Sequence, residues 1–363
     1  MFNETKNRSH GEFDRLMERA GAEANAATWT DWTYFYENAP KNALPLLIEL
    51  EADRMSNLVL REPQVRSEKE VVANERKLRV EDDIEGRALE RLYATAFRRH
   101  PYRWPTIGWM KDIRGFTVDD CRQFYRTHYA PNNATVIVAG DFSERQALSL
   151  VQERYGRLSA ARQVDTAPRP KEPGQRSERV FRIAAPTPTD KLLIGYRVPP
   201  FTDPHTLALG VANELLFGGR SSRLYQLFCL DEEIALSVRG AISPFVDPGL
   251  FEIWISLREG KRMDDAVALL DREVARLAED GPTDIELDKA INQIELSFLY
   301  SMETVGGKAE QLGFYETVVN DGRTGFERLE GYRRVTAGQV KRAAAEYFRP
   351  SRRTRIEISE NAA

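Results

Sequence analysis

Apolar residues along the chain follow two spacings, the alternation typical of strands and the three-to-four-residue period of helices. Alternating segments such as WTYFYE (32–37) and LFEIWISL (250–257) predict strands, because successive side chains of a strand point to opposite faces. Long stretches of helical period lie between the strands. This order favours an α+β fold, with helices packed on one face of a largely antiparallel sheet, over strict βαβ alternation.

One helical segment, SEKEVVANER, carries two glutamates on an unexpected side. At about 100° per residue, Val71, Val72 and Leu78 cluster on one side of the helix, and Glu68 and Glu75 fall between them. Other charged residues of the segment take the opposite side, as an amphipathic helix requires. The pattern therefore predicts two carboxylates that face the protein interior.

The composition is that of an ordinary globular protein. Of 363 residues, 42% are hydrophobic and 30% are charged, and this length favours two domains. A net charge of −4 gives no electrostatic reason to expect a nucleic acid or an acidic membrane surface as partner. With Cys121 and Cys229 as the only cysteines, neither a disulfide framework nor a zinc site built from cysteines is available.

A proline-rich stretch divides the chain. Residues 159–178 carry three prolines, scattered charge and no apolar period, so they should be extended and exposed. We predict an N-terminal domain over residues 1–158, this linker, and a C-terminal domain over residues 179–363.

The two predicted domains look like copies of one another. FTVDDCRQFYRTHYAPNNATVIVAGD from Phe116 matches VTAGQVKRAAAEYFRPSRRTRIEISE from Val335. Matching residues stay 219 positions apart over a long stretch: Thr117 and Thr336, Pro131 and Pro350, Thr135 and Thr354, and Pro63 and Pro282. A constant register of this kind indicates a duplicated domain.

The duplication also indicates what the first domain lacks. In the second domain a predicted strand, KLLIGYRVP, and a predicted helix, PHTLALGVANELLFGG, come before GGRSSRLYQ. In the first domain the matching HGEFDRLME already begins at His10. We therefore expect the first domain to lack its N-terminal strand and helix.

The same offset compares the two glutamates with the second domain. Glu68 corresponds to Leu287 and Glu75 to Ile294, so the scaffold accepts aliphatic residues at these positions. A buried carboxylate costs several kcal/mol unless it is paired or binds a metal, which favours a function for both acids. Two alternatives stay open: Arg79 pairs with Glu75, or the helix packs loosely enough for water to reach both acids.

Several segments resemble the pitrilysin/insulinase family of zinc metallopeptidases, to which the mitochondrial processing peptidase belongs. They are EKEVVANERKLRVEDD, YATAFRRHPYRWPTIGWMKDI, FYRTHYAPNNATVIVAGDF, ERAGAEANAATWTDWTYFYENAPKNAL and GGRSSRLYQLF, and together they cover nearly the whole chain in the family's order. The resemblance implies a zinc-dependent endopeptidase that hydrolyses peptides or proteins. Such enzymes are inverted zincins, in which His-x-x-Glu-His supplies two zinc ligands and the general base.

The resemblance gives the two glutamates distinct roles. Glu75 matches the family's third zinc ligand, and Glu68 matches the glutamate that supports it. Seven residues of helix span about 10 Å, whereas zinc–oxygen bonds are about 2 Å long. The two carboxylates therefore cannot readily bind one zinc ion together.

The histidines depart from the family pattern. His10, His100, His128 and His205 do not form His-x-x-Glu-His, and each is predicted to be an isolated surface histidine. In the family the motif lies on the helix that the first domain is expected to lack, so we expect the chain to begin directly after it. Zinc is thus expected for the complete protein and is expected to be held weakly, or not at all, by this chain alone.

The stretch EANAATWTDWTYFYE predicts two strands joined by a turn. The family uses the first strand as a sheet edge to which an extended peptide adds by backbone hydrogen bonds. The resemblance thus implies substrate binding by Asn25, Ala26 and Thr28, with Ala27 standing where an aromatic residue is common. Without the resemblance, an ordinary hairpin with an aromatic face is the simpler interpretation.

The resemblance also bears on partners. Family partner subunits carry an arginine and a tyrosine that contact substrate, and the matching positions here are Cys229 and Leu236. The chain therefore resembles the zinc-bearing kind of subunit, which implies a homologous partner subunit or a homodimer. The alternative is a non-catalytic structural or assembly subunit, and the retention of Glu68 and Glu75 favours the peptidase. The compartment stays open between the cytoplasm and, given an upstream export signal, the periplasm.

Overall fold

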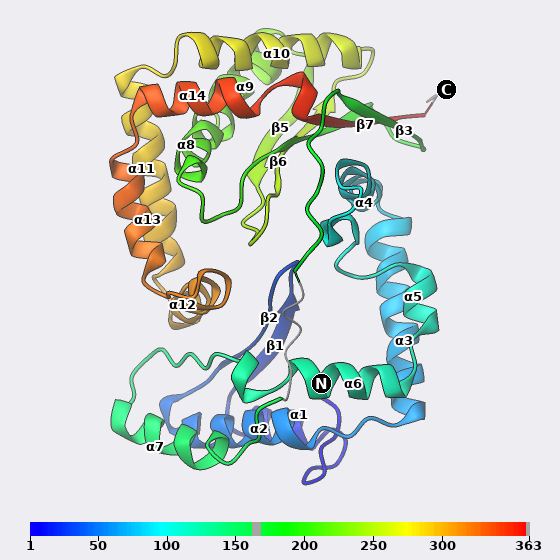
Figure 1. Ribbon diagram of the computed structural model, residues 1–363, viewed down its shortest axis with the longest axis vertical. Helices are drawn as coiled ribbons and strands as arrows, with labels where there is room; N and C mark the ends of the chain where they lie inside the picture. Colours follow the sequence, from blue (N-terminus) through cyan, green and yellow to red (C-terminus); the bar gives the residue numbers. More distant parts are fainter. Residues whose placement is uncertain (162–167, 361–363) are drawn as a thin grey trace. The chain divides into compact units, whose positions relative to one another are not determined.

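The computed structural model describes residues 1–161 and 168–360, and Figure 1 shows its elements. The chain forms two compact units, each assembled from three segments. The first unit contains Met1–Arg76, Thr106–Pro168 and Ser301–Gly322, and the second contains Lys77–Pro105, Arg169–Tyr300 and Arg323–Ala363. Residues 162–167 of the predicted linker lie outside the described residues, and residues 168–176 form neither helix nor strand. Each unit takes segments from both halves, and the predicted domain boundary stays a prediction.

The first unit is mostly helical. Its helices are α1 (Glu12–Arg19), α2 (Leu44–Asn57), α3 (Glu62–Arg76), α5 (Met110–Gly115), α6 (Val118–His128), α7 (Glu144–Tyr155) and α12 (Val305–Val319). Strands β1 (Glu23–Thr28) and β2 (Thr33–Asn38) form a two-stranded antiparallel sheet. Short 3-10 turns cover Lys41–Ala43 and Pro131–Asn133. A small apolar core of Phe13, Met17 and Leu50 joins α1 to α2.

The second unit is built on a five-stranded sheet in the order β3-β7-β4-β6-β5. Its strands are β3 (Arg179–Ala184), β4 (Lys191–Arg197), β5 (Ala235–Ile242), β6 (Leu250–Leu257) and β7 (Arg353–Ser359). All pairings are antiparallel except that of β3 with β7. This arrangement confirms the predicted α+β class.

The helices of the second unit differ widely in length. They are α4 (Ile84–Ala96), α8 (His205–Phe217), α9 (Arg223–Tyr225), α10 (Met263–Glu279), α11 (Asp284–Ser301), α13 (Thr324–Arg333) and α14 (Ala337–Tyr347). Lys77–Glu81 and Gln226–Asp231 are π-helical turns, and Pro101–Arg103 and Pro350–Arg352 are 3-10 turns. Within the described ranges, no helix combines the length and the apolar character that a membrane span needs.

Strand β4 is apolar without alternation because both of its faces are buried. Leu192 and Ile194 belong to the larger apolar core, together with residues of α8, α10 and α14. Leu193 belongs to a second core with Leu92 of α4. A Cβ at Gly195 would lie 3.1 Å from Leu92, so glycine allows this close approach. Helix α4, from the first half, thus covers a sheet face that the sequence pattern left without a helix.

The local structure repeats where the sequence does. Thr117 opens α6 and Thr336 opens α14, each through a capping box in which two groups at the helix start bond reciprocally. Pro131 and Pro350 each open a 3-10 turn. These matching features confirm that the halves are homologous.

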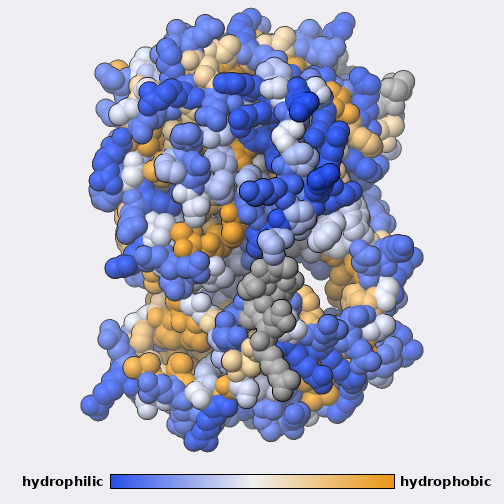
Figure 2. Space-filling model, viewed as in Figure 1, coloured by the Kyte–Doolittle hydropathy of each residue, from blue (hydrophilic) through white to orange (hydrophobic). Residues whose placement is uncertain are grey.

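The segments that follow these turns differ between the halves. Strand β7 pairs with β4 on one side and β3 on the other, and Thr354, Ile356 and Ile358 are fully buried. The matching residues 134–140 form no strand, and Val136 is 45% exposed. Figure 2 shows hydrophobic surface at the lower left, where Figure 1 draws the coil that leads into α7.

The absence of partner strands explains this difference. Counterparts of β3, β4 and α8 do not occur among the residues described for the first unit. Among its described residues the first unit thus has neither the strand nor the helix that it was predicted to lack, and a counterpart of β3 is also not found there. Residues 134–140 have the sequence of a strand, but the part of the chain that the structure describes offers them no neighbouring strand with which to pair.

Candidate functional site

Helix α3 carries both glutamates, and its buried face differs from the predicted one. Its buried residues are Val65, Ala73 and Arg76. Val71 and Leu78, which were predicted to face the interior, are 57% and 70% exposed. At about 100° per residue, the packed face lies roughly a third of a turn from the predicted one. The prediction that this face of the helix points into the core was wrong.

Two cationic side chains explain why the packed face of α3 differs from the predicted one. The Arg76 guanidinium donates to the carbonyl of Gly108 at 2.8 Å and lies over the ring of Trp109. The Lys69 ammonium donates to the carbonyl of Phe116 at 2.8 Å and lies over the same residue's ring. Long cationic side chains bury their alkyl stems while their charges find partners, so a helical wheel wrongly counts both as facing solvent.

Glu68 is exposed and Glu75 is half-buried. At the equivalent positions of α11, Leu287 and Ile294 pack against the larger apolar core, which includes residues of α8. The acids thus stand where the second half places aliphatic side chains against an apolar core to which α8 contributes, and the counterpart of α8 is not described in the first unit. A π-helical turn also begins two residues after Glu75, whereas α11 continues as a regular helix through the same positions. Such turns are frequent at functional sites.

No metal site is complete within residues 1–161 and 168–360. In these ranges no three side chains of histidine, cysteine, aspartate or glutamate are grouped so that they could hold a metal ion. Glu75 is therefore a single candidate ligand, and the residues present do not fit zinc, which takes three or four protein ligands.

The histidines lie apart from α3 in the contacts they make. His205 Nδ1 lies 2.7 Å from the hydroxyl of Tyr347, His128 packs on the ring of Phe124, and His10 is exposed. His100 is buried, contrary to the prediction of a surface residue.

The contacts of His100 define its tautomer. Its Nδ1 accepts from the backbone N–H of Tyr102 at 3.2 Å, so Nε2 carries the proton that faces Asp247 at 3.1 Å. The imidazole is thus used on both sides for packing within the second unit.

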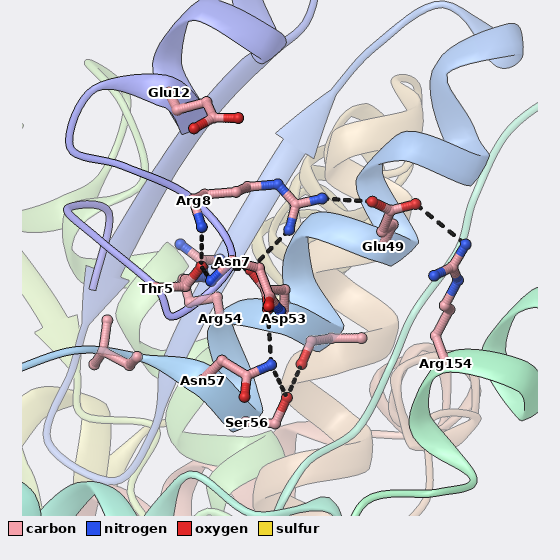
Figure 3. Close-up of polar contacts among 12 residues, drawn as sticks. Thr5, Asn7, Arg8, Glu12, Glu49, Asp53, Arg54, Ser56, Asn57 and Arg154 are labelled. Atoms are coloured by element: carbon pink, nitrogen blue, oxygen red, sulfur yellow. Dashed lines mark hydrogen bonds and ion pairs between the residues drawn. The ribbon is translucent and has the colours of Figure 1, made fainter.

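Asp53 of α2 holds the N-terminal segment (Figure 3). Its carboxylate accepts from Thr5 Oγ1 at 2.6 Å, Asn7 Nδ2 at 2.5 Å, Arg8 Nη1 at 2.7 Å and Asn57 Nδ2 at 2.8 Å. Burial opposes ionisation of Asp53, but these four donors outweigh it and lower its pKa. The clamp fixes the path of residues 5–8 along α2.

Arg54, the next residue, lies at the centre of a buried charge cluster. Its guanidinium stacks between the rings of Phe2 and Phe35, at 4.5 and 4.3 Å. It pairs with Glu51 and, at 3.5 Å, with Glu37. Burial, and then repulsion by Glu51, raises the pKa of Glu37 to about 9. Sequence reasoning missed this cluster, whose signal was the charged run ELEADR inside a helix.

The start of the chain connects this cluster with α3. The Met1 amino group is half-buried, and burial together with Arg54 lowers its pKa, while Glu68 acts in the opposite direction. Glu68 is therefore within electrostatic reach of the N-terminal segment that Asp53 holds.

Strand β1 has a free edge. Among the described residues it pairs with β2 alone. The Trp29 N–H donates to the carbonyl of Trp32 at 2.8 Å, and hydrogen-bonded positions alternate along an antiparallel pair. The backbone groups of Ala24, Ala26 and Thr28 therefore point away from β2.

This edge contains the residues that the resemblance implied for substrate binding. Ala26 and Thr28 present outward backbone groups, and the Asn25 side chain accepts from the Ala26 N–H at 2.8 Å. Their role in binding stays a prediction.

The remaining pair singled out by sequence lies in the second unit. Cys229 is buried in the larger apolar core, where burial raises the pKa of its thiol, and Leu236 is exposed on β5. Neither side chain offers a charge or a hydroxyl to a peptide.

Known proteins resemble the chain over nearly its full length. Residues 1–108 match the family model described as "Insulinase (Peptidase family M16)", and residues 115–294 match that described as "Peptidase M16 inactive domain". The zinc protease PqqE of Helicobacter pylori is 30% identical, over 98% of this chain and 80% of its own. A probable mitochondrial-processing peptidase subunit beta of Schizosaccharomyces pombe is 26% identical, over 86% and 70%. The crystal structure of a protease from Helicobacter pylori superposes with a TM-score of 0.94 at 27% identity, covering 99% of this chain and 86% of that one.

Proposed function

Because the chain belongs to the insulinase (M16) family of peptidases, we propose that it is a subunit of a zinc-dependent endopeptidase acting on peptides or proteins. The retention of Glu68 and Glu75 carries the proposal. The homologous helix α11 is built with Leu287 and Ile294 at these positions, so the scaffold does not need acids there. In this proposal Glu75 is a metal ligand and Glu68 supports it.

The chain does not supply a complete zinc site through its described residues. Two histidines and a general base would have to come from a further segment. Residues 134–140 and the unpaired edge of β2 offer a place for it, because β4 lies between the equivalent strands β7 and β6 in the second unit. A strand there, followed by a helix equivalent to α8, would pack against the stripe of α3 that bears the two acids.

The free edge of β1 is the proposed site for an extended peptide. Backbone groups of Ala26 and Thr28 would pair with the peptide, which gives recognition of an extended shape rather than of one sequence. A peptide carbonyl would replace the Asn25 side chain as acceptor of the Ala26 N–H.

A non-catalytic structural or assembly subunit is the second candidate. The match of residues 115–294 to a family model described as an inactive domain favours it. Cys229 and Leu236 do not distinguish the two candidates. A peptidase subunit would obtain the arginine and tyrosine contacts from a homologous partner, and a structural subunit would not need them.

Zinc titration of an extended chain tests the ligand assignment. The extension is a strand and helix designed on residues 191–217 that carries His-x-x-Glu-His. We expect the extended chain to bind one zinc ion. Glu68→Gln should weaken zinc binding about 10- to 100-fold, and Glu75→Gln should weaken it more. Competition with a chromophoric chelator measures both affinities.

Glu70→Gln is the matched control, because Glu70 is an exposed acid elsewhere on the same helix. Its zinc affinity should equal that of the unsubstituted extended chain. If Glu75→Gln leaves the zinc affinity of the extended chain unchanged, the assignment of Glu75 as a zinc ligand is refuted. Zinc binding without peptide cleavage, even with a homologous partner added, would favour the structural subunit.

A further inference from the structure

We propose that the aromatic face of the β1–β2 hairpin holds a subsite for an arginine or lysine side chain of a peptide bound along β1. The inference rests on the proposed function, because it takes the free edge of β1 as the docking site. It adds the class of side chain that this edge selects.

One face of the hairpin is a ladder of aromatic rings. The register places Ala27 opposite Tyr34 and Asn25 opposite Tyr36, so these four side chains share a face. Trp32 stacks on Tyr34 with ring centroids 4.7 Å apart, and Tyr34 stacks on Tyr36 at 5.4 Å. The rings follow β2, while the outer strand β1 has small side chains beside them.

Helix α12 borders this face and brings a carboxylate to it. Phe314 of α12 contacts Trp32 edge-to-face at 5.8 Å. Glu310, one turn earlier, accepts a hydrogen bond from the Tyr34 hydroxyl at 3.4 Å. Tyr36 and Glu310 are exposed and Tyr34 is half-buried, so the face is open to a ligand. The opposite face of β2 is occupied, because Phe35 packs on Arg54.

Ala27 makes a notch in the outer strand. It lies between Asn25 and the exposed Trp29, which alternation places on the same face. An added strand would lie about 10 Å from β2, two strand spacings away. Between such a strand and the Tyr34 ring stands the methyl group of Ala27, so a long side chain can reach the ring across it. A large residue at position 27 would close the notch.

The chemistry of the notch favours a cation over an apolar side chain. Trp32 and Tyr36 cover the two faces of the Tyr34 ring, so a guanidinium or ammonium that crosses Ala27 reaches the ring edge and the Glu310 carboxylate beside the Tyr34 hydroxyl, with which it can pair. An apolar side chain would cover that carboxylate without offering it a hydrogen bond, which is unfavourable. Burial, and then Glu310, raises the pKa of Tyr34, so the tyrosine remains a neutral donor to the carboxylate.

Peptide binding by the 363-residue chain tests the subsite without reference to metal or cleavage. The probes are two fluorescent peptides of alternating threonine and valine whose central residue is arginine or citrulline, which has the same shape and no charge. Fluorescence anisotropy should show roughly three- to fivefold tighter binding of the arginine peptide, as expected for an exposed ion pair with Glu310, with the preference falling as salt is added.

Two variants should remove this preference by different routes. Glu310→Gln should bring the two affinities to within about 1.5-fold of each other, because it removes the charge that pairs with arginine. Ala27→Phe should abolish the preference while both peptides still bind the edge. Glu303→Gln is the control, because Glu303 is an exposed acid just before α12 and should keep the preference. Glu310 is itself exposed, so its variant decides the matter if Ala27→Phe disturbs the hairpin.

The possible failures are distinguishable. Equal binding of the two peptides to the unsubstituted chain, or a preference that Glu310→Gln leaves intact, would overturn the subsite and leave the docking edge standing. If neither peptide binds, the docking edge of the proposed function falls, and the subsite falls with it.

Discussion

At the scale of single residues, two carboxylates of the first unit respond to burial in opposite ways. Asp53 accepts four hydrogen bonds, which outweigh burial and lower its pKa. Glu37 has Arg54 at 3.5 Å, but burial and the adjacent Glu51 prevail and raise its pKa. The number of donors makes the difference, because hydrogen bonds to the ionised form offset the cost of removing it from water.

Glu37→Gln should remove a pH-dependent loss of stability. The pKa of Glu37 is raised from 4.5 to about 9, so across this interval the folded chain holds a proton that the unfolded chain has released. Stability therefore falls as the pH rises from about 5 to about 9. The neutral variant should match the unsubstituted chain near pH 5 and exceed it at pH 8 by several kcal/mol, because each pH unit within this interval is worth about 1.4 kcal/mol. Thermal unfolding followed by circular dichroism measures this.

Asp53→Asn is the control with the opposite sign. Because the pKa of Asp53 is lowered, its contribution is present above the ordinary value and is lost as the pH falls through the folded value. The variant should cost about 1–3 kcal/mol at neutral pH and progressively less in acid. A Glu37→Gln variant that is less stable at pH 8 would show that Glu37 is ionised and paired with Arg54 in the folded chain.

At the scale of elements, a neighbouring strand decides whether a strand-like sequence becomes a strand. Residues 134–140 and 353–359 occupy equivalent places after equivalent helices and turns. The second segment forms β7 because β3 and β4 flank it, and the first remains coil. Backbone N–H and C=O groups need partners when buried, so an unflanked strand stays open to solvent.

Hydrogen exchange should report this difference directly. Backbone amides of residues 135–139 should exchange at rates close to those of an unfolded peptide, and those of residues 354–358 should be strongly protected. A synthetic peptide with the sequence of β4, DKLLIGYRV, should slow exchange at residues 135–139 and in β2 when added in excess. Protection of residues 135–139 without the peptide would contradict the vacant strand position. The amides of β7 are the internal control and should not change.

At the scale of the whole molecule, the two homologous halves do not correspond to the two compact units. Helix α4 of the first half buries Leu92 and Ala96 against the sheet of the second unit. Helix α12 of the second half contacts β2 in the first unit. Each unit therefore depends on a helix that comes from the other half of the chain.

Separate expression of residues 1–158 and 179–363 should therefore fail to give two folded domains. Without α4, the second fragment would expose Leu193, Ile356 and Ile358, which are now fully buried on one sheet face. We expect the fragment to aggregate alone and to become soluble when both fragments are co-expressed. Size-exclusion chromatography and circular dichroism measure the outcome, and the intact chain is the reference. A monomeric, cooperatively folding second fragment would contradict the dependence on α4.

The sequence by itself determined the features that depend on local chemistry. Thr117 and Thr336 predict helix starts, and Pro131 and Pro350 predict turns. The constant spacing between the matching residues of the two halves establishes the repeat. The β1–β2 hairpin likewise follows from alternation within a short window. Each of these features is set by residues a few positions apart, so no distant partner had to be known.

Only the tertiary structure decided the features that depend on distant partners. The buried side of α3 was decided by Trp109 and Phe116, which take up the stems of Arg76 and Lys69. The coil at residues 134–140 was decided by the absence of flanking strands among the described residues of its unit. The second face of the five-stranded sheet is covered by α4, which lies more than eighty positions before β3 in the sequence. Packing and strand pairing join residues far apart in sequence, and a periodic pattern does not specify which ones will meet.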